Sequence, residues 1–326
     1  MKIPIHPYSV YTTKEAAQLL SVDPITVQRY IRTGKLGATR LGKVYRITGQ
    51  ALLDLMSLDQ ESIKFAQDRV RKVENAKYIQ SKAFLLTDPR GQKYIELFNI
   101  TTDSLLASLN PDHVENDEDQ LTLRYIGSRI FNTAMAAYRD ALSGYYQVSI
   151  SNQRDLIETQ FLTDFFRSFP EKIKEWRAAE NKTRRQFSPV ELRKKLDERD
   201  DFKDKKREAR YRQFSEYATH ITYSGFQLLA NTDKKIEIGP FYDEFKLINT
   251  FHDLCLNFGA VVISLQANLK IKDGKTAALW VQQMETFDTV LGFKITESET
   301  FKIAKKNLLE AVKKLQLIQE KREQTK

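Results

Sequence analysis

The chain has 326 residues, of which 41% are hydrophobic and 29% charged, as in a globular protein of about two domains. It contains only 12 Gly and 8 Pro, too few turn formers for a β-sandwich or β-barrel of this length, so we expect a mainly α fold. The formal net charge of +9 favours a polyanionic partner.

Location and cofactor content are suggested by what the sequence lacks. A single cysteine, Cys255, excludes a disulfide framework and a cysteine-based zinc site, and it is consistent with a reducing cytoplasm. No apolar run reaches about 18 residues, and the first ten residues lack the apolar core of a signal peptide. We therefore expect a cytoplasmic protein with no membrane partner, no metal and no cofactor.

Two helices with clear start and stop signals are expected near the N-terminus. Thr12 or Thr13 can cap the first, and Asp23 followed by Pro24 marks the start of the second. Gly34 suits the end of the second helix, because glycine adopts the left-handed conformation that closes a helix. Two helices joined by about three residues form a helix-turn-helix unit.

A hairpin and a closing helix are expected next. Residues 36–40 and 44–47 read as extended runs joined by a tight turn at residues 41–43. Such a hairpin after the second helix is a wing, whose basic residues can reach phosphates beside a DNA groove. Residues 50–56 then supply a third helix that closes a small core.

The runs TTKEAAQLL, TVQRYIRTGKL and ATRLGKVYRI, within residues 8–57, resemble the excisionase-type, MerR-like winged helix-turn-helix family. The resemblance implies binding of double-stranded DNA, with the second helix in the major groove and the wing on the backbone or minor groove. The DNA-facing residues that it implies are Thr26, Gln28, Arg29 and Arg32 on the helix and Arg40, Lys43 and Arg46 on the wing. A winged domain used for protein contacts is the alternative.

Beyond this winged domain the charge pattern changes. Residues 58–117 read as a charged linker and an irregular segment, with a charged helix or linker over residues 60–82. Residues 170–214 hold 16 Lys/Arg and 10 Asp/Glu, a balance of +6 that compares with +5 for residues 1–57. Because the signs alternate at helical spacing, this block is typical of a solvated helix with i,i+4 ion pairs. A second nucleic-acid surface is the alternative.

Residues 118–326 are expected to form a larger all-helical domain. Apolar spacing between residues 120 and 169 predicts two long helices split near residues 149–151. Residues 213–230 also look helical, residues 243–269 read as an apolar buried helix, and a last amphipathic helix is expected over residues 298–323.

Part of this helical domain weakly resembles the HEPN type and related bacterial helical families, through residues 136–166. In those families an Arg and a Glu on one long helix meet a polar residue from a later helix, which implies Arg154, Glu158 and His220 as candidate catalytic residues here. The HEPN ribonuclease signature places His about four to six residues after Arg, whereas Arg212 and His220 are eight apart. An Arg154–Glu158 ion pair that closes a helical core is the structural alternative.

The sequence as a whole favours a sequence-specific DNA-binding protein, a bacterial or mobile-element transcriptional regulator. Its helical domain would serve oligomerisation or sensing, because one small DNA-binding module binds weakly by itself. A homo-oligomer is therefore expected. The alternatives are a DNA-targeted defence effector or toxin with a HEPN-like ribonuclease domain, and a scaffold that uses the winged domain for protein docking.

Overall fold

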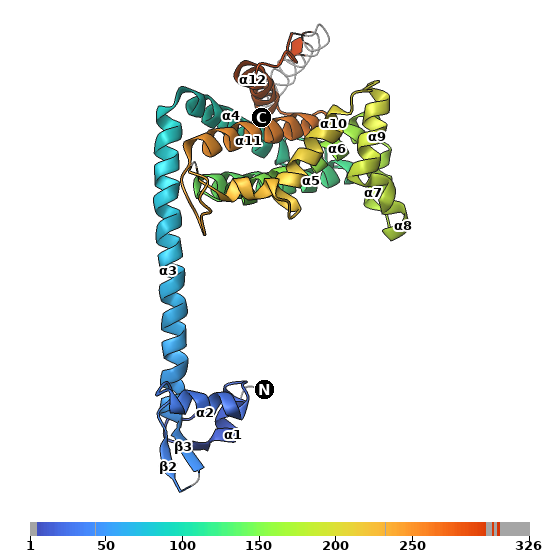
Figure 1. The fold of residues 1–326 in the computed structure, drawn as a ribbon. Coiled ribbons are helices and arrows are strands. Elements are labelled where there is room, and N and C mark those ends of the chain that lie inside the picture. The colour runs from blue at the N-terminus through green and yellow to red at the C-terminus, as the bar shows by residue number, and fades with distance from the viewer. Residues whose placement is uncertain (1–4, 43, 232, 298–301, 303–304, 307–326) are drawn as a thin grey trace, which may run out of the picture. The chain divides into compact units, whose positions relative to one another are not determined.

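The computed structural model describes residues 5–42, 44–231, 233–297, 302, 305 and 306. By contacts the chain divides into two compact units, Met1–Val73 and Glu74–Lys326. The first is here called the N-terminal unit and the second the helical body. Figure 1 shows the elements of each unit.

The N-terminal unit is a winged helix-turn-helix. Its elements in chain order are β1 (Val10–Thr12), α1 (Thr13–Leu19), α2 (Pro24–Arg32), β2 (Thr39–Leu41), β3 (Val44–Thr48) and the first part of α3 (Gly49–Thr87). The three strands form an antiparallel sheet in the order β1-β3-β2. The hairpin of β2 and β3 confirms the expected wing, whereas β1 had no counterpart in the sequence analysis.

Local signals set the ends of the two short helices as expected. Thr12 caps α1 through a reciprocal capping box with Glu15, and its hydroxyl accepts the Glu15 backbone N–H at 3.3 Å. One carboxylate oxygen of Asp23 accepts the N–H groups of Ile25 and Thr26 at 2.8 and 3.0 Å at the start of α2. Gly34, with φ of +73°, follows the end of α2.

The segment 58–117 is far more regular than expected. Helix α3 has 39 residues and continues through the charged stretch, so the predicted closing helix is only its beginning. Helix α4 (Pro89–Leu109) occupies most of the part expected to be irregular. The Asp88 side chain caps α4 and Pro89 takes its first position, so the turn signals there separate two helices.

The helical body continues with a series of helices and short turns. They are α5 (Glu118–Leu142), α6 (Tyr146–Ser168), α7 (Lys172–Arg177), α8 (Asn181–Arg184), η1 (Arg185–Phe187), α9 (Pro189–Arg199), α10 (Lys206–Phe214), η2 (Ser215–Thr219), η3 (Ser224–Leu229), α11 (Glu244–Gln266) and α12 (Gly274–Leu291). Helices α5, α6 and α11 pack side by side, and α4 packs on α11 and α12 (Figure 1).

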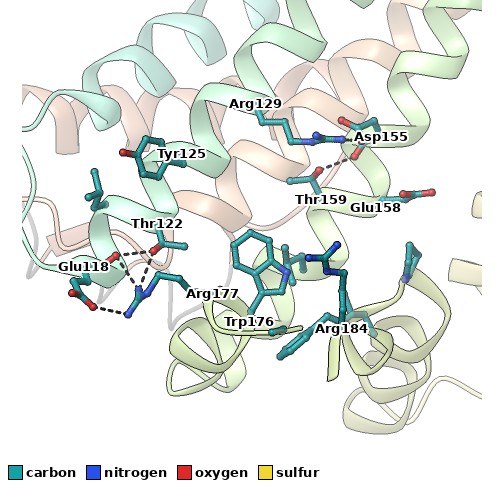
Figure 2. A pocket seen from close by; sticks show the side chains of 16 residues that line it. Glu118, Thr122, Tyr125, Arg129, Asp155, Glu158, Thr159, Trp176, Arg177 and Arg184 are labelled. Carbon is teal, nitrogen blue, oxygen red and sulfur yellow. Dashed lines mark hydrogen bonds and ion pairs between the residues drawn. The ribbon is translucent and has the colours of Figure 1, made fainter. Parts of the chain in front are cut away.

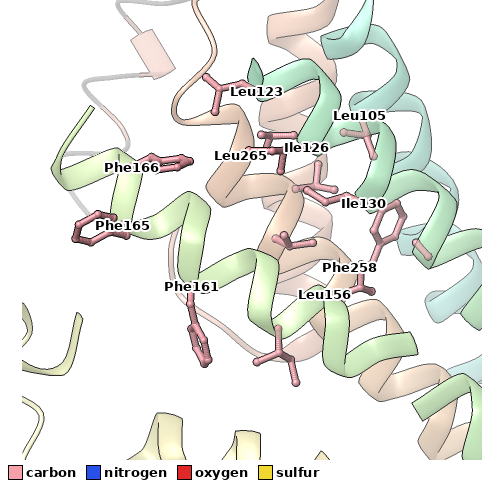
Figure 3. Close-up of a cluster of buried hydrophobic side chains, with 14 of the residues drawn as sticks. Leu105, Leu123, Ile126, Ile130, Leu156, Phe161, Phe165, Phe166, Phe258 and Leu265 are labelled. Carbon is pink, nitrogen blue, oxygen red and sulfur yellow. The ribbon is translucent and has the colours of Figure 1, made fainter. Parts of the chain in front are cut away.

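The main core of the helical body lies among these long helices. Leu123 and Ile130 of α5, Leu156 of α6, and Phe258 and Leu265 of α11 are each at most 1% exposed and point toward one another (Figure 3). Burying a side chain of this size contributes about 1.5–3 kcal/mol. Because this core holds α6 and α11 together, it also sets the positions of the polar side chains on these two helices.

The two long helices α5 and α6 separate at Ser143–Tyr145, so the predicted split near residues 149–151 is wrong. Gly144 has φ of +85°, and a Cβ there would lie 2.1 Å from the carbonyl oxygen of Phe241. Ser149 lies inside α6, where its hydroxyl donates to the carbonyl of Ala137 at 2.8 Å. The buried hydroxyl of Ser149 is therefore satisfied inside the helix, although the serines at residues 149–151 suggested a helix end in the sequence.

The later part of the body differs from expectation in one place. Helix α10 ends at Phe214, and the stretch predicted to be helical continues as the π-helix η2 and, after a break at residues 220–223, as the 3-10 helix η3. The predicted last helix over residues 298–323 falls almost wholly outside the described residues.

Helix α11 matches the predicted apolar helix. In length and composition it could cross a membrane, and 67% of its apolar window is buried inside the fold. Burial against α4, α5 and α6 explains its hydrophobicity as that of a core helix.

Candidate nucleic-acid interface

Helix α2 presents a polar face opposite the face that holds it in the fold. Val27 is fully buried in the small core with Ala16 and Ile47. At about 100° per residue, Gln28, Arg29 and Arg32 lie within one arc on the other side. All three are exposed. The helix is therefore anchored by one side and offers amide and guanidinium groups on the other.

The arginines of this surface have no ion-pair partner among the described residues. Within the part of the chain that the structure describes, Arg29, Arg32, Arg40 and Arg46 take part in no ion pair. A guanidinium carries five N–H donors in a planar fork that suits paired acceptors on a guanine edge or a phosphate. Apart from the Nε of Arg40, which donates to the carbonyl of Gly42, these donors remain available for a ligand.

Thr26 has a local role that the sequence did not reveal. It is half-buried, and its hydroxyl donates to the second carboxylate oxygen of Asp23 at 3.0 Å. Hydrogen bonds from Thr26 to Asp23, first from its backbone and then from its side chain, lower the pKa of Asp23. Thr26 thus completes the cap of α2.

Ile25 was absent from the expected set. It is an apolar side chain in the first turn of α2, and it is 78% exposed on the same arc as Arg29. Its sequence signal was weak, because a lone isoleucine beside Pro24 reads as core. Exposed apolar groups on such a helix can contact the methyl group of thymine.

The wing holds two of the expected basic residues in different ways. Arg40 is exposed, and its Nε donates to the carbonyl of Gly42 at 3.2 Å across the turn. Arg46, on the central strand β3, is half-buried. Hydrogen bonds from Thr12 are the main reason why the pKa of Glu15 is lowered, and the nearby positive charge of Arg46 lowers this pKa further. Lys43 lies outside the described residues.

The charged block of the helical body contrasts with this surface. Arg177 binds Glu118 and Asp119 at 3.0 and 2.6 Å, and Arg199 binds Asp164 and Asp200 at 3.1 and 2.7 Å. The pairs of Arg177 and the Arg199–Asp164 pair join different helices, and Arg212 also pairs with Glu216 at the expected i,i+4 spacing, at 3.6 Å. These ion pairs stabilise the fold of the block, whereas Arg184 and Arg185 lie exposed.

Arg154 and Glu158, two of the three candidate catalytic residues, do meet on α6. Their ion pair measures 2.9 Å, and the hydroxyl of Tyr211 accepts from Arg154 at 2.5 Å and donates to Glu158 at 2.9 Å. His220 is exposed, and no hydrogen bond, ion pair or ring contact within the described ranges connects it to either residue. The observed third partner is Tyr211, which ties α10 to α6.

A cavity of about 1030 Å³ lies beside this cluster. Glu158, Asp155 and Arg129 line one wall, and Trp176 and Arg184 line another (Figure 2). The carboxylate of Asp155 is already bound by Arg129 at 2.6 Å and by Thr133 at 3.1 Å. Among the described residues no group of three or more His, Cys, Asp or Glu side chains could hold a metal ion.

Comparisons with known proteins concern the N-terminal unit. Residues 10–57 match the family model described as a helix-turn-helix domain, and this segment is an excisionase-type helix-turn-helix domain. Two curated proteins, each described as magnetosome protein MamR, match over 53 residues. The protein from Paramagnetospirillum magneticum is 42% identical and that from Magnetospirillum gryphiswaldense 38% identical.

These matches are confined to one region. The matched stretch is 16% of this chain, and the chain spans 63% of the length of each relative. No solved structure matches the chain. The similarity therefore describes the helix-turn-helix domain and leaves the helical body without a relative among these proteins.

Proposed function

We propose that this chain is a sequence-specific double-stranded DNA-binding protein that acts as a bacterial transcriptional regulator. The observation that carries the proposal is the exposed arc of α2, where Gln28, Arg29 and Arg32 bind no carboxylate of the described residues. The helix-turn-helix match over residues 10–57 supports it. The cytoplasmic location expected from the sequence belongs to the same proposal, because the DNA of a bacterium lies there.

Each side chain has a distinct task in this proposal. Helix α2 enters the major groove, where Arg29 and Arg32 donate paired hydrogen bonds to guanine and Gln28 bonds to adenine. Ile25 contacts a thymine methyl group. The wing residues Arg40, Lys43 and Arg46 bind phosphates, which fixes register and adds salt dependence without sequence choice.

We further propose that the chain acts as a homo-oligomer. A single module of this size buries only about 600–1,000 Å² on DNA, which gives weak binding. Val70 and Val73 on α3 are 48% and 39% exposed and are three residues apart, so they share a helix face. Pairing of that face between two copies would bury both valines. Sedimentation velocity of the full chain should show a dimer, and a strict monomer with and without DNA would contradict oligomerisation.

The proposed activity is tested by selection of genomic DNA fragments on the full chain at a low and a high salt concentration. Fragments that share a sequence and survive high salt indicate base readout. The Arg29→Ala plus Arg32→Ala variant should lose these fragments. A matched control is Arg184→Ala plus Arg185→Ala, which removes the same charge from exposed positions of the helical body. Uniform loss of all fragments at high salt would contradict sequence-specific recognition.

A further inference from the structure

A second cavity in the helical body combines basic and apolar walls. It has a volume of about 370 Å³ and lies among α6, α10, α11 and the end of α12. Phe161, Leu256 and Phe287 form apolar wall, and Arg167, Arg207 and Arg210 also line the cavity. Ligand sites in proteins have this size and this mixture of apolar wall and few polar groups.

Two of the three arginines are neutralised by carboxylates. Arg207 binds Asp197 at 2.7 Å and also binds Asp200, and Arg167 binds Asp164 at 2.9 Å. Their charges are therefore balanced by the fold itself. Asp164 is the one carboxylate among the residues that line the cavity.

Arg210 differs from both. Within the described residues its guanidinium makes no ion pair, and its one side-chain hydrogen bond runs from Nη2 to the Oδ1 of Asn257 at 2.6 Å. The charge of Asp253 raises the pKa of Arg210, but no ion pair joins the two among the described residues. Burial lowers the pKa of Arg210, because removal from water disfavours the charged form.

A chain of hydrogen bonds among buried polar groups holds the Arg210 side chain in place. Asn257 is 1% exposed and donates to the Oε1 of Gln153 at 3.3 Å. Gln153, fully buried, donates in turn to the carbonyl of Thr250 at 3.2 Å. The guanidinium is thus fixed at the cavity wall while most of its five N–H donors remain unused.

A half-buried cation without a counterion is costly, and an anion in the same low-dielectric site relieves that cost. We propose that this cavity binds a small organic carboxylate, with its carboxylate on Arg210 and its apolar body against Phe161 and Phe287. A single unpaired guanidinium suits one negative charge, because carboxylates of the fold already balance Arg167 and Arg207. The site is independent of the proposed DNA binding.

Isothermal titration calorimetry on the full chain tests the proposal with benzoate, phenylacetate and 4-methylpentanoate as probes. At least one should bind, and benzamide, which has the shape of benzoate without its charge, should not. Arg210→Gln should weaken binding at least tenfold, about 1.4 kcal/mol. The control Arg129→Gln, at an exposed ion pair in the other cavity, should leave binding unchanged.

Two further readouts separate ligand binding from folding. Without ligand, Arg210→Gln should melt at the same temperature or higher, because it removes an uncompensated charge. Ala260→Leu, which fills the cavity and keeps Arg210, should also weaken binding at least tenfold. The proposal is overturned if none of the three carboxylates binds at millimolar concentration, if benzamide binds as well as benzoate, or if Arg210→Gln binds as tightly as the unaltered chain.

Discussion

The N-terminal unit and the charged block of the helical body carry almost equal excess charge, +5 over residues 1–57 and +6 over residues 170–214. In the structure, the two regions differ in whether their arginines form ion pairs with carboxylates. On α2 the guanidinium groups of Arg29 and Arg32 pair with no carboxylate in the part of the chain that the structure describes, whereas Arg177, Arg199 and Arg207 each bind two. Net charge therefore locates a polyanion-binding surface only where the fold leaves cations uncompensated.

The largest effect is expected from removing the free arginines of α2. Arg29→Ala plus Arg32→Ala should weaken binding to a selected DNA site by about hundredfold or more, since each paired contact to a base contributes about 1–3 kcal/mol. Fluorescence anisotropy on full-length protein measures the change. The Arg184→Ala plus Arg185→Ala control should change affinity less than threefold. An equal loss of DNA affinity in the two variants would contradict a special role for the arginines of α2.

The next effect concerns a paired arginine. Arg154→Ala should lower the free energy of unfolding by about 2 kcal/mol, because it leaves Glu158 and Tyr211 without their charged partner. DNA affinity at a temperature where the variant is folded should not change. His220→Ala should alter stability by less than about 0.5 kcal/mol, as for an exposed residue.

These variants also address the ribonuclease alternative. Urea unfolding and an RNA cleavage assay on the same samples distinguish the roles. Cleavage by the unaltered chain that both Arg154→Ala and His220→Ala abolish would contradict a purely structural role for the Arg154 cluster.

A smaller, pH-dependent effect is expected at Asp200. Hydrogen bonds from Arg199 lower the pKa of Asp200 to about 2. Burial of the carboxylate acts in the opposite direction, and hydrogen bonding by Arg207 adds to the lowering. Because the folded-state pKa lies below that of the unfolded chain, the ion pairs stabilise the fold above the ordinary aspartate pKa. This stabilisation is lost as the pH falls toward 2.

Asp200→Asn should therefore melt roughly 2–4 °C lower than the unaltered chain at pH 7, a modest shift for partly exposed ion pairs. The difference should shrink as the pH falls to about 2. Circular dichroism melts across this range measure it, and a difference that is constant with pH would show that Asp200 is not stabilised by its charge.

The smallest effect is expected at the wing. Arg40→Ala should weaken DNA binding only a few-fold and equally for different sequences, and it should reduce the slope of log affinity against log salt by about 1. Anisotropy titrations at several salt concentrations measure this slope. A loss confined to one sequence would instead assign base readout to the wing.

Short-range signals made the N-terminal unit largely predictable. Asp23, Pro24 and Gly34 act on their own few residues, so spacing alone located α2 and its ends. Strand β1 escaped because it is three residues long and exists only through pairing with β3, in which Val10 meets Thr48. Such a pairing leaves no local pattern.

The helical body was predictable in class but not in its contacts. The partner of Arg154 and Glu158 is Tyr211, more than 50 residues away, and no spacing rule points to it. The same holds for Arg210, which belongs to a run of alternating charges whose members pair across helices. Only the three-dimensional structure shows which arginine of this run lacks an ion-pair partner among the described residues.

The central claim, that α2 reads base edges, is tested most directly by methylation interference on a selected DNA site. Methyl groups at N7 of particular guanines should block binding of the unaltered chain, since arginine donates to O6 and N7 in the major groove. In the Arg29→Ala variant, interference at one of these guanines should disappear while the others persist. Interference by phosphate ethylation alone, with no guanine sensitive to methylation, would contradict base reading by α2.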